Sequence, residues 1–406
     1  MDPAVVDPYV LDWLNLLLRW AHVITAIAWI GSSFYFVFLD SSLTPPTDPE
    51  LKAKGVGGEL WAVHGGGFYH PQKYLVAPQK LPANLHWFYW ESYSTWLTGF
   101  ALFTVLYLFN AGSFLIDKTV FDWSPAAAIA TALGFLVAFW VFYDLICRWL
   151  GERQGQVGGD LKVGIAVLVF VVVASWLACQ LFAGRAAFLL VGAMLATAMS
   201  ANVFFWIIPG QKKVIAQMKA GLPVEAIHGQ RAKQRSVHNT YFTLPVLVAM
   251  LSNHYGWLYQ GPWNWLVLVL LMLAGALIRH SFVARHKALV QGQRVPWEHA
   301  VVGTALLVGL AIWLAPAPAP KVAAGTPPPS FAEVRAVVEQ RCLICHNAAV
   351  AQKNVALHTP ELIVQHAQAV YQQTVVLKLM PMNNATQITE AERQLIQRWY
   401  QAGAKP

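Results

Sequence analysis

Eight apolar segments, each close to the length of a membrane-spanning helix, leave this chain few ways to fold. A helix needs about 20 predominantly apolar residues to cross the hydrocarbon core of a bilayer. Only 12% of the 406 residues are charged, about half the share found in soluble proteins. The sequence therefore predicts an all-α chain whose residues 1–315 form a polytopic membrane bundle of about eight transmembrane helices. The apolar segments cover residues 12–39, 86–110, 124–149, 162–183, 185–208, 238–259, 263–283 and 299–315.

A Pro/Ala-rich linker and a short polar domain follow the last apolar segment. Residues 316–330 are rich in proline and alanine, which favours an extended, semi-rigid spacer. Residues 331–406 contain the pentapeptide Cys342-Leu-Ile-Cys345-His346. C-x-x-C-H is the pattern by which two thiols attach one haem, with the adjacent histidine as an axial ligand of the iron. We therefore predict a covalent haem c at this motif.

A second axial ligand is available about 35 residues after the motif, where Met380 and Met382 flank Pro381. A thioether opposite histidine raises the potential of the iron, which suits an electron acceptor. We predict Met380 as the ligand, with Met382 as the alternative, so that His346 and Met380 hold the metal. Helical patterns flank this region at 331–341 and at 389–400, where the second helix begins with a capping-box sequence. The arrangement resembles class I cytochrome c.

The distribution of basic residues gives an independent orientation. Bacterial haem c is attached outside the cytoplasmic membrane, so eight spans also place the N-terminus outside. The loops then predicted to lie inside carry most of the lysines and arginines of the membrane domain, whereas its outside stretches carry only Lys118 and Arg185. This asymmetry follows the positive-inside rule. The net charge of +8 is therefore explained by membrane orientation, and nucleic acid is not expected as a partner. The predicted inside loops are 40–85, 150–161, 209–237 and 284–298.

Polar residues within the spans are candidates for function because they are costly to bury in lipid. For any one histidine, the plain alternative is an interfacial or hydrogen-bonded side chain. A substrate oxidised at the inner face would require electrons to cross about 30 Å of hydrocarbon, which calls for a relay. A b-type haem between helices is a second candidate cofactor, with His22 and His254 as its proposed ligands. A substrate site at the outer face would remove this need.

Three stretches give the chain a family resemblance: residues 18–36, residues 235–246 with 251–255, and residues 380–386. Together they resemble the membrane-bound, cytochrome-c-type urate oxidases (urate hydroxylases) of bacteria. The resemblance implies oxidation of urate to 5-hydroxyisourate without hydrogen peroxide. Electrons would pass to the fused haem c, and then to a terminal oxidase or a soluble cytochrome. It further implies an enzyme in the lipid bilayer of the bacterial inner membrane, with the cytochrome domain in the periplasm.

Urate is a planar anion with amide groups, and this suggests roles for side chains of the membrane domain. We expect Arg279 to clamp the anion and Glu91 or His86 to act as the base, because a carboxyl group in a low-dielectric setting gains basicity. His238 is a further catalytic candidate. Accompanying clamp or stacking residues would be Gln72, Asn239, Phe68, Trp87 and Trp90. One alternative is a respiratory cytochrome that relays electrons from quinol or a partner to a terminal oxidase. Another is a membrane anchor that only holds the cytochrome.

Overall fold

A computed structural model describes residues 8–74, 78, 80–315 and 328–406. It is mostly helical, with 70% helix and 5% strand. Within the described residues, five helices are long and apolar enough to cross a membrane by length and composition. They are α1 (Pro8–Ser42), α5 (Pro125–Gly151), α6 (Asp160–Leu181), the continuous α7 (Gly184–Ala201), η2 (Asn202–Ile207) and α8 (Ile208–Lys219), and α10 (Asn264–Val290).

The other three apolar segments also contain helices. They correspond to α3 (Trp90–Phe103) with its π-helical continuation η1 (Thr104–Leu108), to α9 (Ala226–Leu251), and to α11 (Glu298–Trp313). Several boundaries differ from the sequence prediction. Helix α9 begins at Ala226, before the predicted start at 238, and α10 continues to Val290, past the predicted end at 283. Residues 86–89 precede α3 rather than belonging to it. The predicted span 238–259 ends as a helix at Leu251, and its remainder forms two short 3₁₀ turns, η3 (Ser252–His254) and η4 (Gly256–Leu258).

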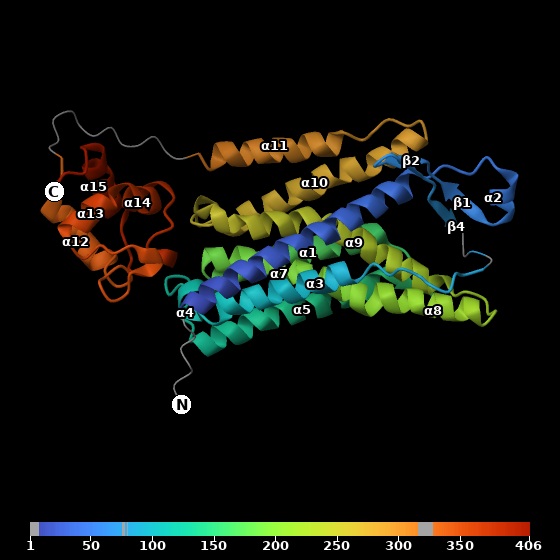
Figure 1. The fold of residues 1–406 in the computed structure, drawn as a ribbon, viewed down its shortest axis with the longest axis horizontal. Coiled ribbons are helices and arrows are strands. Elements are labelled where there is room, and N and C mark those ends of the chain that lie inside the picture. Colours follow the sequence, from blue (N-terminus) through green and yellow to red (C-terminus); the bar gives the residue numbers. More distant parts are fainter. Residues whose placement is uncertain (1–7, 75–77, 79, 316–327) are drawn as a thin grey trace.

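The long helices pack side by side around α7, the most buried of them (Figure 1). Helix α1 lies against α3 and α10, while α10 also contacts α9 and α11. Small residues allow close approach of helices in an apolar environment. At Gly192 of α7, for example, a Cβ atom would lie 2.8 Å from Cβ of Ala249 on α9. The main apolar core runs along α5, α6, α7 and α10.

The bundle has two chemically different ends (Figure 1). We call the end next to the C-terminal helices the motif end; it includes α4 (Ala111–Phe114). The opposite end holds the loops that carry most of the basic residues, as the charge pattern predicts. Its small elements are α2 (Pro49–Ala53), β1 (Val56–Glu59) paired antiparallel with β4 (Gln72–Tyr74), β2 (Ala62–His64) paired with β3 (Gly67–Tyr69), and β5 (Glu152–Arg153) paired with β6 (Gln156–Val157).

Residues 328–406 form a separate helical unit with its own apolar core. Its first helix, α12, and its last, α15, pack against each other. Both begin with the reciprocal capping box, which confirms the predicted pair of Thr389 and Glu392. Burial opposes ionisation of Glu392, but hydrogen bonds from Thr389 and Arg341 outweigh it and lower its pKa. The elements are α12 (Phe331–Arg341), η5 (Gln352–Asn354), α13 (Pro360–Gln365), α14 (Ala367–Tyr371), η6 (Gln372–Val376), η7 (Met382–Asn384) and α15 (Glu390–Gln401).

Candidate functional site

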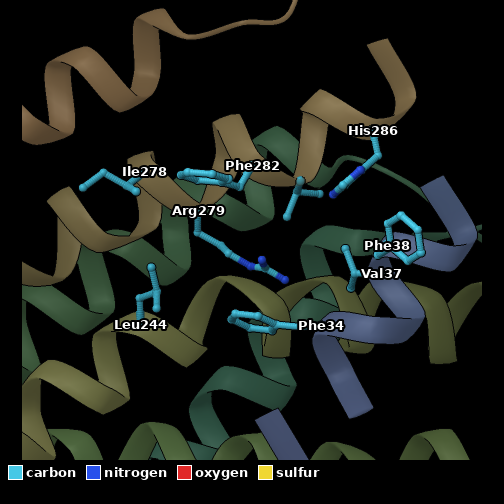
Figure 2. Close-up of a pocket in the computed structure, with 9 residues that line it drawn as sticks. Phe34, Val37, Phe38, Leu244, Ile278, Arg279, Phe282 and His286 are labelled. Atoms are coloured by element: carbon cyan, nitrogen blue, oxygen red, sulfur yellow. The ribbon is translucent and has the colours of Figure 1, made fainter. Parts of the chain in front are cut away.

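A cavity of about 470 Å³ lies between α1, α9 and α10, and Arg279 lies in its wall (Figure 2). This volume falls within the range of small-molecule sites, which are mostly apolar with a few placed polar groups. Arg279 is the only arginine of the lining, and His286 is its only histidine. The other lining residues are Phe34, Val37, Phe38, Leu244, Ile278, Phe282 and Val283.

The Arg279 side chain is only 9% exposed. Among the described residues, neither its Nε nor its Nη2 has a hydrogen-bond partner. Its guanidinium carbon lies 3.6 Å from the centroid of the Phe34 ring, a cation–π contact that compensates only part of the cost of burying a charge. Each unsatisfied buried donor costs about 1–3 kcal/mol, and more when it is charged. Such a group is expected where a ligand supplies the missing acceptors.

Aromatic rings and one histidine complete the cavity. Figure 2 shows Arg279 extending from α10 toward Phe34 on α1, with His286 pointing toward the same space from farther along α10. The His286 ring packs edge-on against Phe38, with 5.0 Å between centroids. A flat, anionic ligand suits this lining, because rings offer stacking surfaces and the guanidinium offers two parallel donors.

A polar cluster adjoins Arg279 on the neighbouring helices. Tyr241 Oη and Nδ1 of His280 are 2.8 Å apart, and the rings of His280 and His299 lie 4.4 Å apart. Nδ1 of His299 is buried, and the part of the chain that the structure describes offers it no partner. The cluster thus joins α9, α10 and α11 around the residue that follows Arg279.

His238 belongs to a different network, between α5, η2 and α9. Its Nδ1 lies 2.8 Å from Oη of Tyr143, and Asn202 donates to both Tyr143 and Asn239. In the same layer, Nη2 of the buried Arg235 donates to Asp144 at 2.7 Å. None of these residues lines the Arg279 cavity.

Glu91 and His86 also lie away from the cavity. His86 is exposed, and its ring packs 4.6 Å from that of Phe88. It lines a second pocket of about 350 Å³ together with Trp87 and residues near α8. Glu91 is half-buried in the first turn of α3. The structure therefore brings Arg279 into the cavity, but it does not bring Glu91, His86 or His238 there.

The two proposed haem b ligands are not adjacent in the structure. Nδ1 of His22 contacts Thr95 O at 3.1 Å and Thr98 Oγ1 at 3.2 Å. His254 is exposed at the motif end, directly after Asn253, which accepts a hydrogen bond from Tyr107. Thr98 lies in α3, whereas Tyr107 lies nine residues farther along the chain, in η1. The two histidines thus have different local partners, and a haem b held by this pair stays a prediction.

The C-x-x-C-H residues are arranged in a way that suits covalent haem. Cys342 is buried beside the core of the unit, whereas Cys345 is exposed. Burial raises the pKa of the Cys342 thiol to about 11. Nδ1 of His346 lies 2.9 Å from Val355 O. When Nδ1 donates to this carbonyl, Nε2 is left as a metal ligand.

The segment that contains Met380 is anchored within the same unit. The backbone N–H of Met380 donates to Gln373 O at 3.1 Å, and the carbonyl of Met380 accepts from Nη1 of Arg393 at 3.0 Å. Nη1 of Arg393 also donates to Thr374 O. The backbone on both sides of the Met380 side chain is therefore fixed.

The sequence indicated Arg279 but not the residues around it. Phe34 and Phe38 are one helical turn apart on α1, as are Phe282 and His286 on α10. Aromatic pairs at spacing i, i+4 place two rings on one face of a helix, and this was the sequence signal that pointed to the cavity lining. It was insufficient because apolar residues occur all around both helices, so the facing side could not be distinguished.

The comparisons with known proteins concern the membrane bundle. No curated protein and no solved structure matches the chain. The family model described as urate oxidase N-terminal matches residues 8–315, which is more than half of the chain and includes the whole Arg279 cavity. The chain therefore belongs to the urate oxidase N-terminal family.

Proposed function

We propose that this protein is a membrane urate oxidase that converts urate to 5-hydroxyisourate in the Arg279 cavity. The electrons pass to a haem c on Cys342 and Cys345. The observation that carries the proposal is a buried guanidinium with unpaired donors in an aromatic cavity, in a chain that belongs to a urate oxidase family.

Urate matches the cavity in charge and shape. It is a planar monoanion at neutral pH, and its negative charge would pair with the Arg279 guanidinium through Nε and Nη2. Its ring system would stack on the phenylalanines of the lining. A neutral substrate would leave the buried charge of Arg279 unpaired, at a cost of several kcal/mol.

The reaction adds water to urate and removes two electrons. One urate anion and one water give neutral 5-hydroxyisourate, two electrons and one proton. His286 is the ionisable side chain that faces the same space as Arg279, so we assign it as the group that receives this proton. Glu91, His86 and His238 lie elsewhere, so direct proton transfer from a ligand in this cavity favours His286 over them.

The C-terminal unit would take up the electrons. Cys342, Cys345 and His346 would hold the haem, and Met380 would be the second axial ligand. Such a haem accepts one electron at a time at a potential raised by the thioether. A terminal oxidase or a soluble cytochrome would then reoxidise it.

The proposed location is the bacterial cytoplasmic membrane, with the motif end facing the periplasm. Five suitable helices support the membrane location, and the basic loops at the opposite end support the orientation. Arg279 lies 15 residues from the start of α10 at the motif end, which is about 22 Å along the helix. An electron path of this length needs a relay within the bundle, for which a b-type haem with His22 and His254 as ligands stays the candidate.

Anaerobic addition of urate to the purified protein tests the proposal. We expect urate to reduce the haem, as seen in its visible absorption, and to appear as 5-hydroxyisourate in a ratio of one urate to two electrons. Dithionite serves as the control for full reduction. If quinol reduces the haem and urate does not, the protein is instead a respiratory electron-transfer cytochrome and the proposal fails.

A further inference from the structure

The bundle touches the C-terminal unit at the segment that carries Met380. Nε2 of Gln260 donates to Lys378 O at 2.7 Å. Gly256 lies so close to this segment that a Cβ atom there would be 2.6 Å from Cδ2 of Leu379 and 3.1 Å from Leu377 O. On the other side of Pro381, η7 lies against α4. The bundle therefore contacts the chain both before and after Met380.

The two contact points on the bundle are tied together by one polar cluster. Oδ1 of Asn253, in η3, accepts from Tyr107 Oη at 2.9 Å and from Arg185 Nε at 3.2 Å. The Arg185 guanidinium lies over the ring of Phe114, in α4, at 5.4 Å from its centroid. Helix α4 and the turn 252–260 thus form one surface, which we call the docking surface.

The opposite side of the Met380 segment is held by the C-terminal unit. Arg393 donates to the carbonyl of Met380, and Lys378 forms an ion pair with Glu390 at 2.9 Å. The segment is therefore clamped between two bodies. This differs from an ordinary tether, in which the linker alone would join the domains and no contact would involve the ligand loop.

We propose that the docking surface is a positioning site for the axial ligand: it holds Met380 on the iron and makes the methionine side of the haem the side that faces the bundle. The inference rests on the proposed haem c. Electrons from the bundle then enter through the Met380 side, and the exposed Cys345 side is left for the external acceptor. Gly256 and Gln260 are positioning residues that act through Met380.

Two glycines in the same turn provide a matched pair of variants. Gly256→Leu places a side chain against Leu377 and Leu379. Gly261→Leu adds the same side chain where the described residues leave open space within 4 Å of the added Cβ. Gly256 and Gly261 both have backbone conformations open to other residues. The two variants therefore differ in the docking contact rather than in added bulk or apolar surface.

The test is spectroscopic and uses the full-length protein with haem attached. In Gly256→Leu, we expect partial loss of the methionine–iron charge-transfer band, a lower midpoint potential, and carbon monoxide binding to the reduced haem at several times the wild-type extent. Gly261→Leu should match the wild type in all three. Gln260→Ala should shift the same readouts in the same direction, but less.

Equal spectra, potentials and carbon monoxide binding in Gly256→Leu and Gly261→Leu would overturn the inference. If Gly256→Leu does not accumulate, Gly256→Ala and Gln260→Ala replace it, with the same criterion. A wild-type protein without covalent haem, or without a methionine–iron band, would instead refute the proposed function. In that case a Gly256→Cys, Leu379→Cys pair still tests the contact, because it should cross-link on oxidation, and failure to do so would refute the docking itself.

Discussion

Replacing Arg279 by methionine should abolish urate binding without weakening the fold, and this combination tests the assignment of the cavity. The wild-type protein buries a guanidinium whose Nε and Nη2 have no hydrogen-bond partner among the described residues. Two charge-assisted hydrogen bonds to urate contribute about 1.5–3 kcal/mol each, or about 3–6 kcal/mol together. Their loss corresponds to a roughly hundred- to ten-thousand-fold weaker affinity.

The stability of the urate-free protein should move the other way. Replacing a buried charge by an apolar side chain of similar length is neutral or stabilising by about 1–4 kcal/mol. The lost contact with Phe34 offsets about 0.5–2 kcal/mol of this gain. We therefore expect Arg279→Met to unfold at the wild-type temperature or slightly above it.

Thermal unfolding in detergent, with and without urate, measures both effects. Urate at 100 times the wild-type dissociation constant should stabilise the wild type by about 2.7 kcal/mol, and Arg279→Met by no more than about 0.4 kcal/mol. Arg294→Met, in the exposed turn after α10, is the control and should retain the urate response. A variant that keeps the urate response, or that unfolds far below the wild type without urate, would refute the reasoning.

Three further predictions follow from described contacts. Gly99→Ala should destabilise the bundle by about 1–3 kcal/mol, because the new Cβ would lie 2.7 Å from Cε1 of His22. Gly134 faces open space among the described residues, so Gly134→Ala should instead stabilise the bundle by about 0.5–1 kcal/mol. Thermal unfolding compares the two variants. His346→Ala should retain thioether-linked haem in a pyridine haemochrome assay but lose the low-spin spectrum, and an unchanged low-spin spectrum would exclude His346 as the ligand. Folding lowers the pKa of Glu392, so the stabilising contribution of this carboxylate is present above its unfolded pKa and disappears as pH falls through its folded pKa. Glu392→Gln should therefore be less stable than the wild type at pH 7 and equally stable below the folded pKa. A stability difference that does not change with pH would contradict this prediction.

The sequence predicts the positions of the long helices well, because an apolar run of about 20 residues has few alternatives in lipid. It predicts several helix ends less well, two of them where irregular segments replace the expected helix. Four of the eight residues of 252–259 are aromatic or aliphatic. The side chains of Ser252 and Asn253 nevertheless donate to backbone carbonyls of the preceding turn, so α9 stops at Leu251. Residues 86–89 similarly precede α3 as an irregular segment.

The candidate site was only partly predictable. A buried arginine in a span is conspicuous in any sequence, so Arg279 was found. Its partners were not, because Phe34 and Phe282 meet only when α1 and α10 pack with particular faces together. His286 lies three residues beyond the predicted end of its span and was assigned to a loop. Which of these residues line the cavity depends on how pairs of helices pack against each other, and not on the properties of any one helix.

The unequal burial of the two motif cysteines has a consequence for the biogenesis of the protein. In the folded C-terminal unit the Cys342 thiol is buried and its pKa is about 11, so it is poorly reactive, while Cys345 remains accessible. Under the proposed function, a haem that joins both thiols would reach Cys342 most readily before the unit closes. That proposal favours export, haem attachment and folding in that order.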